Sequence, residues 1–216
     1  MKYTLYHYIH CPFCIRVRMA LGYLQIPYES MPVSYEDEKT PLALTGVKML
    51  PILVDENGIA INESLDIMAK IDRSNVLKIS ESIQHPHFIE LEKLLNTVGG
   101  PIHSLAMPQW IYTKEFSPAA REYFQKKKEI KRGPFKDLVH NKIKFLNELD
   151  KYWPEILNNL NPFYKSQEFG LFDILIASHL WGLYIVPEFQ FPPEIHLYLQ
   201  RIKLICNFDY HEDLWR

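Results

Sequence analysis

The pattern of apolar and polar positions divides the chain into an N-terminal part with mixed periods and a longer, helical part. Residues 2–9 alternate with a period near two and are rich in Tyr, Thr and Ile, which predicts a strand. Residues 26–33 predict a second strand, and between the two strands apolar residues recur at helical spacing. This helix has an apolar stripe (Val17, Ala20, Leu21, Leu24) and polar residues that we place on its solvent side (Arg16, Arg18, Gln25). A helical connection predicts that the two strands pair in parallel.

A short helix and a hairpin follow. Thr40-Pro41 begins the short helix, which is expected to end near Gly46. The apolar runs 48–54 and 59–61 flank Asn57-Gly58, a strong signal for two antiparallel strands joined by a tight turn.

A proline opens the third strand, and a last helix closes this unit. Pro51 is unusual at the head of a strand, since proline cannot donate to a sheet ladder, and a proline at this place is a candidate for a cis peptide bond. Residues 62–64 (Asn-Glu-Ser) are expected to cap a helix whose apolar face is Leu65, Met68 and Ile71. The order of elements predicts a small α/β domain over residues 1–75.

The remainder lacks a strand pattern and is divided by prolines, which predicts an all-helical domain over residues 86–216 after a linker at 76–85. Five helices are expected: one with the stripe Phe88, Leu91, Leu94 and Leu95 that ends near Gly99-Gly100-Pro101, one capped by Ser117, one with the stripe Val139, Ile143, Leu146 and Leu149, one over 172–185, and one over 193–205. The segment 172–185 is apolar on nearly all sides, which is typical of a helix at the centre of a bundle. Aromatic residues end the chain at Phe208, Tyr210 and Trp215.

Composition narrows the possible functions. The formal net charge of −2 over 216 residues gives no electrostatic case for nucleic-acid binding. The basic run 126–132 includes Glu129 and is expected to be a solvated helix face. No run approaches the ~20 apolar residues of a membrane span, and the first residues are typical of a strand, not of a signal peptide. Three cysteines, an odd number, suit a reducing compartment, and the cytoplasm is expected.

The chemistry centres on Cys11-Pro12-Phe13-Cys14, which lies between the first strand and the first helix. Two cysteines in the first turn of a helix bring their sulfurs together where backbone N–H groups favour a thiolate, and proline is tolerated there. This context favours a redox pair. His7 and His10 precede the pair and leave a zinc site as an alternative, but four ligands in eight residues leave little chain to enclose a metal. No bound metal is expected.

The chain resembles a known family in several segments: His10-Cys11-Pro12-Phe13-Cys14, Thr40-Pro41 with Gly46, Leu50-Pro51-Ile52-Leu53, Glu63-Ser64-Leu65-Asp66-Ile67, and Ser117-Pro118-Ala119-Ala120-Arg121. The first half is similar to the glutaredoxins of the thioredoxin superfamily, and the helical half to glutathione S-transferases. Together they resemble the two-domain bacterial glutaredoxin 2 type. The resemblance implies a thioredoxin-like α/β domain followed by an all-α domain in a glutathione S-transferase-like architecture.

The resemblance also implies a site. Cys11 corresponds to the attacking cysteine and Cys14 to the resolving one. Pro51 corresponds to a cis-proline that faces the site, and the Leu50 backbone to the segment that holds the cysteinyl part of glutathione. Glu63 and Ser64 correspond to the residues that hold its γ-glutamyl end, where a helix start suits a carboxylate and Glu63 an ammonium. Without the resemblance, plain helix capping would also account for Glu63 and Ser64.

The chain departs from the family pattern at two places. Phe13 stands where the family usually has Tyr, and we expect little effect. Gly170-x-x-Asp173 stands where a Ser/Thr-x-x-Asp box begins the central helix, so that helix start is expected to be weaker, although Asp173 can still cap it.

Other residues have open roles. His10 is either a stabiliser of the Cys11 thiolate or exposed to solvent, and Arg16 is a candidate source of positive charge for the site. Tyr6 could activate the glutathione thiol as a tyrosine does in some transferases, but the cysteine pair makes this role redundant. Cys206 is expected to be an inert buried thiol, and the four tryptophans (Trp110, Trp153, Trp181, Trp215) to be core or interface anchors.

These observations predict a glutathione-dependent thiol–disulfide oxidoreductase. It would act as a monomer on glutathionylated or disulfide-bonded proteins, with glutathione as co-substrate and no tightly bound cofactor. One alternative is a transferase or dehydroascorbate reductase that uses Cys11 alone. Another is a non-enzymatic module that binds a metal, an iron–sulfur cluster or a partner; Pro12 argues against a cluster, since cluster-binding glutaredoxins usually have Gly there.

Overall fold

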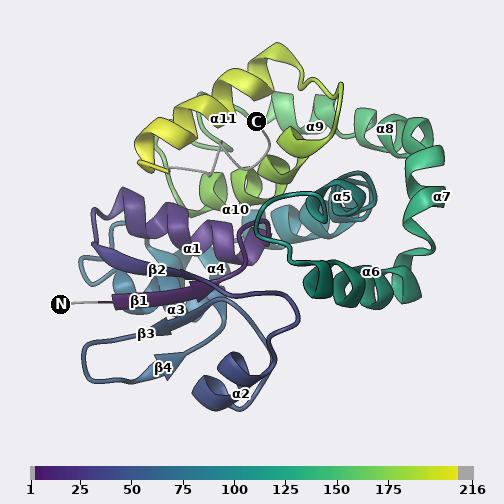
Figure 1. Cartoon of the computed structure of the whole chain (residues 1–216). Helices are drawn as coiled ribbons and strands as arrows, with labels where there is room; N and C mark the ends of the chain where they lie inside the picture. Colours follow the sequence, from purple (N-terminus) through teal and green to yellow (C-terminus); the bar gives the residue numbers. More distant parts are fainter. Residues whose placement is uncertain (1–2, 209–216) are drawn as a thin grey trace.

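A mixed sheet of four strands forms the centre of the N-terminal part (Figure 1). The computed structural model describes residues 3–208. The strands are β1 (Tyr3–His7), β2 (Tyr28–Pro32), β3 (Ile52–Val54) and β4 (Ala60–Ile61), in the order β2-β1-β3-β4. β1 pairs with β2 in parallel, and β3 is antiparallel to both β1 and β4. The predicted strands, the parallel pair and the hairpin are therefore confirmed.

Three helices complete the α/β part: α1 (Pro12–Tyr23), α2 (Lys39–Thr45) and α3 (Ser64–Ile71). α2 ends at Gly46, whose φ of 75° is a left-handed conformation that glycine adopts without a steric cost. α1 lies between two layers, because it packs against α3 on one side and against α10 of the helical part on the other.

This double packing makes one prediction wrong. Arg16 and Arg18 were placed on the solvent side of α1, yet their exposed fractions are 3% and 5%. The Arg16 guanidinium lies 4.7 Å from the centre of the Phe13 ring, and that of Arg18 lies 5.0 Å from the Phe208 ring. A helix covered by a sheet on one side and a second domain on the other has no wide solvent face, so its cations lie against aromatic rings.

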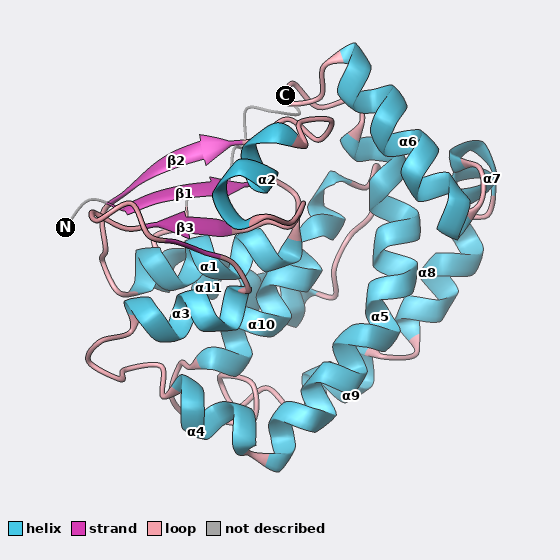
Figure 2. Cartoon of the chain, turned by 90° about the horizontal axis from the view of Figure 1, so that it is seen from below, coloured by secondary structure: helices cyan, strands magenta, loops and turns pink. Residues whose placement is uncertain are grey.

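The rest of the described chain is helical, with no strand of the sheet among its elements. Its helices are α4 (Ile79–Gln84), α5 (Pro86–Trp110), α6 (Pro118–Arg132), α7 (Phe135–His140), α8 (Lys142–Asp150), α9 (Trp153–Asn158), α10 (Leu171–Leu180), the 3₁₀ helix η1 (Trp181–Ile185) and α11 (Pro193–Ile205). Helix α4 lies in the segment 76–85 that was predicted as a linker. In the view from below, α6, α7 and α8 lie away from the sheet (Figure 2), and Figure 1 shows α1 between the sheet and the helices α10 and α11.

Helix α5 continues where the sequence predicted an end. It runs through Gly99, Gly100 and Pro101 to Trp110. The Gly100 carbonyl accepts hydrogen bonds from Ser104 Oγ at 3.0 Å and from Arg132 Nη1 at 3.1 Å. α5 packs against α7, α8, α10 and η1, and this burial outweighs the local preference of glycine and proline to end a helix.

The stripe predicted for residues 139–149 is also wrong in part. The segment is divided at Asn141 into α7 and α8, and the break changes the side of the helix that faces the core. Val139 and Ile143 are consequently 50% and 66% exposed, whereas Leu149 is fully buried.

Other predictions for the helical part are confirmed. Ser117 Oγ accepts a hydrogen bond from the N–H of Ala120 at 3.0 Å and caps α6. α11 has the predicted bounds, and α10 is buried on nearly all sides. Asp173 does cap its own helix, since Oδ2 accepts from the Gly170 N–H at 2.9 Å. Tyr210 and Trp215 lie outside the described residues.

Among residues 3–208, no helix combines the length and the apolarity that crossing a bilayer requires.

Candidate active site

The two cysteines of the Cys11–Cys14 motif lie at the start of α1, in different environments. Cys11 is the extended residue that precedes the helix, and Pro12 occupies the first helical position. The Cys11 side chain is half-buried, whereas Cys14 is fully buried. The Tyr8 N–H donates to Cys14 Sγ at 3.3 Å. Of the two thiols, Cys11 is therefore the one that a substrate can reach.

The electrostatics separate the two thiols further. The Cys14 thiol donates a hydrogen bond to Cys11, which is the largest influence on the pKa of Cys11 and lowers it to about 7 against the opposing effect of burial. The N–H groups of Cys14 and Phe13 and the charge of Arg16 lower it further. Burial raises the pKa of Cys14 well above its ordinary range. The arrangement holds a thiolate on Cys11 and a proton on Cys14.

This difference predicts how the protein reacts with an alkylating agent at different pH values. An acidic thiol with a pKa of about 7 is roughly one-tenth thiolate at pH 6, about a hundredfold more than a thiol with a pKa of 9. We expect iodoacetamide to modify Cys11 with a rate that rises from pH 5 to pH 8 with a midpoint near 7. Peptide mapping measures the site. A midpoint above pH 8.5, or preferential labelling of Cys14, would contradict this account.

The residues implied for a glutathione site do not all lie in one cavity. The Leu50–Pro51 peptide bond is cis, as predicted. Ser64 is the first residue of α3 and is buried, and Glu63 precedes it, exposed, with a φ of 65°. The helix begins at the predicted place, with Glu63 at the N-cap position of α3, but the Glu63 side chain makes no capping hydrogen bond.

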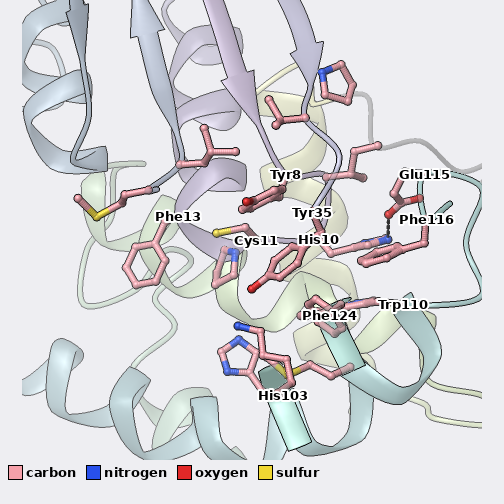
Figure 3. Close-up of a pocket in the computed structure, with 18 of the residues that line it drawn as sticks. Tyr8, His10, Cys11, Phe13, Tyr35, His103, Trp110, Glu115, Phe116 and Phe124 are labelled. Atoms are coloured by element: carbon pink, nitrogen blue, oxygen red, sulfur yellow. Dashed lines mark ion pairs between the residues drawn. The ribbon is translucent and has the colours of Figure 1, made fainter. Parts of the chain in front are cut away.

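A pocket of about 310 Å³ lies between the cysteine loop and the helices α5 and α6 (Figure 3). Cys11, Phe13 and Leu50 line it, whereas Pro51, Glu63 and Ser64 do not. The sequence analysis missed most of the remaining lining: Tyr8, Tyr35, Lys48, Met49, His103, Met107, Glu115, Phe116, Phe124 and Lys128. These residues come from distant parts of the sequence, and their meeting in one pocket depends on how the two parts of the chain pack together.

His10 connects the cysteine loop to the helical part. It is 4% exposed, so the solvent-exposed alternative is wrong. Its ring stacks on Trp110 with centroids 5.4 Å apart and planes 3° apart, and Nε2 lies 3.3 Å from Thr113 Oγ1 and contacts the Glu115 carboxylate. Trp110 ends α5, and Thr113 and Glu115 follow it. These three residues therefore hold His10, which directly precedes Cys11.

Glu115→Ala is expected to destabilise the protein, because the substitution leaves His10 buried without its carboxylate partner. We expect the free energy of unfolding to fall by about 2 kcal/mol. Denaturant unfolding at pH 7 measures this effect. Glu122→Ala, at an exposed position of α6, is the control and should change stability by less than ~0.5 kcal/mol. Equal losses in the two variants would show that the His10 contact contributes nothing.

The other candidates take structural places. His7 Nε2 is hydrogen-bonded to Ser30 Oγ at 2.7 Å, and no group of three or more His, Cys, Asp or Glu side chains within residues 3–208 is arranged to hold a metal ion. Cys206 is fully buried, and burial raises its pKa. Tyr6 lies in β1 and is not among the lining residues of the pocket.

The tryptophans are buried where the structure describes them. Trp110, Trp153 and Trp181 are each less than a tenth exposed, and Trp110 also lines the pocket. Trp215 lies outside the described residues. The basic face of α6 is exposed at Lys126, Lys127 and Lys131, as predicted, but Lys128 is half-buried and lines the pocket.

Comparisons with known proteins match both parts of the chain. Residues 5–76 match the family described as glutathione S-transferase, N-terminal domain, and residues 90–208 match the family described as glutaredoxin 2, C terminal domain. Glutaredoxin 2 of Escherichia coli strain K12 is 36% identical over 138 residues, and this match covers 62% of the chain and 63% of the relative's length.

Solved structures give the same picture over nearly the whole length. A crystal structure of glutaredoxin 2 from Salmonella typhimurium in complex with glutathione is similar with a TM-score of 0.86 and 26% identity, covering 99% of both chains. A glutathione S-transferase of Ceriporiopsis subvermispora, also in complex with glutathione, has a TM-score of 0.70 at 18% identity, covering 96% of this chain and 99% of that one. The latter likeness concerns the fold alone.

Proposed function

This chain belongs to the glutaredoxin 2 family, and from that premise we propose that it is a glutathione-dependent thiol–disulfide oxidoreductase. The observation that carries the proposal is the asymmetry of the cysteine pair. Cys11 is accessible and has a lowered pKa, and Cys14 beside it is buried and protonated. A thiolate that a substrate can reach, next to a second thiol, has the properties that thiol–disulfide exchange requires.

The reaction proceeds by two exchanges. The Cys11 thiolate attacks the glutathione sulfur of a mixed disulfide, the substrate S–S bond breaks, and the substrate leaves as a thiolate while a Cys11–glutathione disulfide forms. A second glutathione thiolate attacks that disulfide, releases oxidised glutathione and restores the Cys11 thiolate. The substrate thiolate takes up the proton that the second glutathione loses. With a disulfide-bonded protein as substrate, the Cys11 thiolate first breaks the substrate S–S bond and forms a mixed disulfide with one of its sulfurs. Cys14 then attacks Cys11 Sγ, the substrate leaves as a dithiol that takes up the Cys14 proton, and the resulting Cys11–Cys14 disulfide is reduced by two glutathione molecules.

We place glutathione along Leu50-Pro51 and the start of α3. The Leu50 backbone would pair with the cysteinyl part, and Ser64 and Glu63 would hold the γ-glutamyl end. Two features support this placement. Leu50 lines the same pocket as Cys11, and the N-terminus of α3 offers backbone N–H groups to a carboxylate.

The remaining parts of the proposal concern organisation and partners. We divide the chain into an α/β domain at 1–75, a linker at 76–85 and a helical domain at 86–216. We propose a cytoplasmic monomer whose partners are glutathione and glutathionylated or disulfide-bonded proteins. The odd number of cysteines, three, supports a reducing compartment.

Turnover of the mixed disulfide of glutathione with 2-mercaptoethanol tests the proposal. Glutathione reductase and NADPH recycle the oxidised glutathione, so NADPH consumption measures the rate. We expect saturable turnover well above the spontaneous exchange. No turnover by a protein whose cysteines are confirmed reduced would favour a transferase or a binding role on the same fold.

A further inference from the structure

The pocket beside Cys11 extends away from the proposed glutathione contacts. One end is formed by Cys11, Phe13 and Leu50, and the opposite end by residues of α5 and α6. Pro51, Glu63 and Ser64 are not part of its lining. A mixed disulfide has two halves, and the pocket lies where the half that is not glutathione would extend from the reacting sulfurs.

Aromatic rings form a large part of the walls of this pocket. Tyr35 lies at the centre, with its ring centroid 4.8 Å from that of Tyr8 and 4.6 Å from that of Phe124. Phe116 lies 5.2 Å from Phe124 and 6.4 Å from Tyr35. Figure 3 shows Tyr8 above Cys11 and Tyr35 below it, with Phe124 and His103 farther below. Surfaces of this kind bind flat aromatic groups through stacked and edge contacts.

Among the described residues, one cation of the lining, Lys128, has aromatic rings but no anion as neighbours. Lys128 Nζ lies 5.4 Å from the Tyr35 ring centre and 5.5 Å from that of Phe124, and within residues 3–208 it forms no hydrogen bond or ion pair. The other charges of the lining are compensated. Lys48 forms an ion pair with Glu38 at 3.2 Å and also donates to the Tyr35 carbonyl at 3.0 Å, and Glu115 contacts His10.

His103 adds a second donor at the same end. Arg132 Nη2 donates to His103 Nδ1 at 3.2 Å, so a neutral His103 carries its proton on Nε2. Burial, with the nearby charge of Arg132, keeps the pKa of His103 near 3, so the ring is neutral at pH 7. A free ammonium and an N–H donor at the end of an aromatic pocket complement an aromatic group that carries a carboxylate.

We propose that this pocket binds the non-glutathione half of a mixed disulfide when that half is an aromatic thiol bearing a carboxylate. The aromatic ring packs against Tyr8, Tyr35 and Phe124, and the carboxylate pairs with Lys128 and accepts from His103. This inference rests on the proposed function. In the exchange, the Cys11 thiolate forms a disulfide with glutathione, the substrate S–S bond breaks, and the aromatic thiolate leaves within the pocket.

Three mixed disulfides of glutathione test the inference: one with 5-thio-2-nitrobenzoate, which is aromatic and carboxylated, one with 4-nitrothiophenol, which is aromatic only, and one with 2-mercaptoethanol, which is neither. Each is turned over by the wild type, by Lys128→Gln and by Lys126→Gln, an exposed position of the same helix outside the pocket. For each substrate, the KM of the variant is divided by the KM of the wild type, so that differences between the leaving groups cancel.

We expect Lys128→Gln to raise KM about tenfold for the carboxylated aromatic substrate and less than twofold for the other two. Lys128→Arg should restore the wild-type KM, and Lys126→Gln should change none. No change with Lys128→Gln would overturn the inference. An equal rise for all three substrates would also overturn it, because Lys128 would then contact glutathione.

Direct binding separates this inference from the proposed function. If the wild type turns over none of the three disulfides, the proposed function fails, and calorimetric titration with 4-nitrobenzoate still tests the pocket. We expect binding to the wild type that weakens about tenfold in Lys128→Gln and is unchanged in Lys126→Gln. No binding to the wild type, or equal binding to all variants, would overturn the inference.

Discussion

Cys11→Ser is expected to reduce turnover of every mixed disulfide by about a thousandfold or more, to the spontaneous rate. The reason is that a serine hydroxyl is not ionised near pH 7, whereas Cys11, with a pKa of about 7, is roughly half thiolate there. Cys14→Ser is expected to retain turnover of glutathione mixed disulfides, because a second glutathione resolves the intermediate. The coupled assay with glutathione reductase measures both variants.

The hydrogen bond from Cys14 to Cys11 allows a second comparison, between Cys14→Ser and Cys14→Ala. A serine at position 14 can still donate to the Cys11 thiolate, but an alanine cannot. Since the Cys14 hydrogen bond is the largest influence that lowers the pKa of Cys11, Cys14→Ala should raise that pKa more than Cys14→Ser does. Equal loss of turnover in Cys11→Ser and Cys14→Ser would contradict the assignment of Cys11 as the nucleophile.

Asp173→Ala is expected to cause the largest loss of stability, about 3–4 kcal/mol. The carboxylate is 1% exposed and accepts hydrogen bonds from the N–H of Tyr164 at 2.8 Å, the N–H of Gly170 at 2.9 Å and the hydroxyl of Tyr198 at 2.7 Å. Without it, three buried donors lose their acceptor. Urea unfolding at pH 7 measures the loss, with the exposed Asp137→Ala as the control.

The same carboxyl predicts a pH dependence. Burial raises the pKa of Asp173 to about 6, above its ordinary value of 3.8. The native protein then binds more protons than the unfolded chain between these values, so this group's contribution to stability falls as the pH rises from about 4 to 6, by on the order of 2 kcal/mol. Asp173→Asn should lack this fall. If the free energy of unfolding changed with pH in the same way in the wild type and in Asp173→Asn between about pH 4 and 6, the predicted contribution of Asp173 would be contradicted.

The elements that the sequence predicted well are those that local chemistry determines. Strand β1, the parallel β2, the hairpin around Asn57-Gly58 and the cap at Ser117 follow from alternation, turn residues and side-chain acceptors close in sequence. The helix α10, apolar on all sides, is central as expected. These features can be predicted without knowing how the two parts of the chain pack together.

The errors occur where distant segments pack together. Arg16 is buried because α10 covers α1, and α5 passes through Gly100 and Pro101 because five other elements pack on it. His10 faces Glu115, more than a hundred residues away along the chain. The pocket likewise brings together residues that are far apart in the sequence, Tyr8 and Tyr35 with Phe124. Periodicity in one segment contains no information about which segment covers it, so these contacts required the structure.

The most direct test of the account is the intact mass of Cys14→Ser after reaction with one equivalent of a glutathione mixed disulfide. Without Cys14, the intermediate can be resolved only by added glutathione, so it accumulates when none is supplied. We predict one glutathionyl group per chain, located on Cys11 by peptide mapping and removed by added glutathione. An unmodified protein, or the group on Cys206, would contradict the claim that Cys11 carries glutathione during turnover.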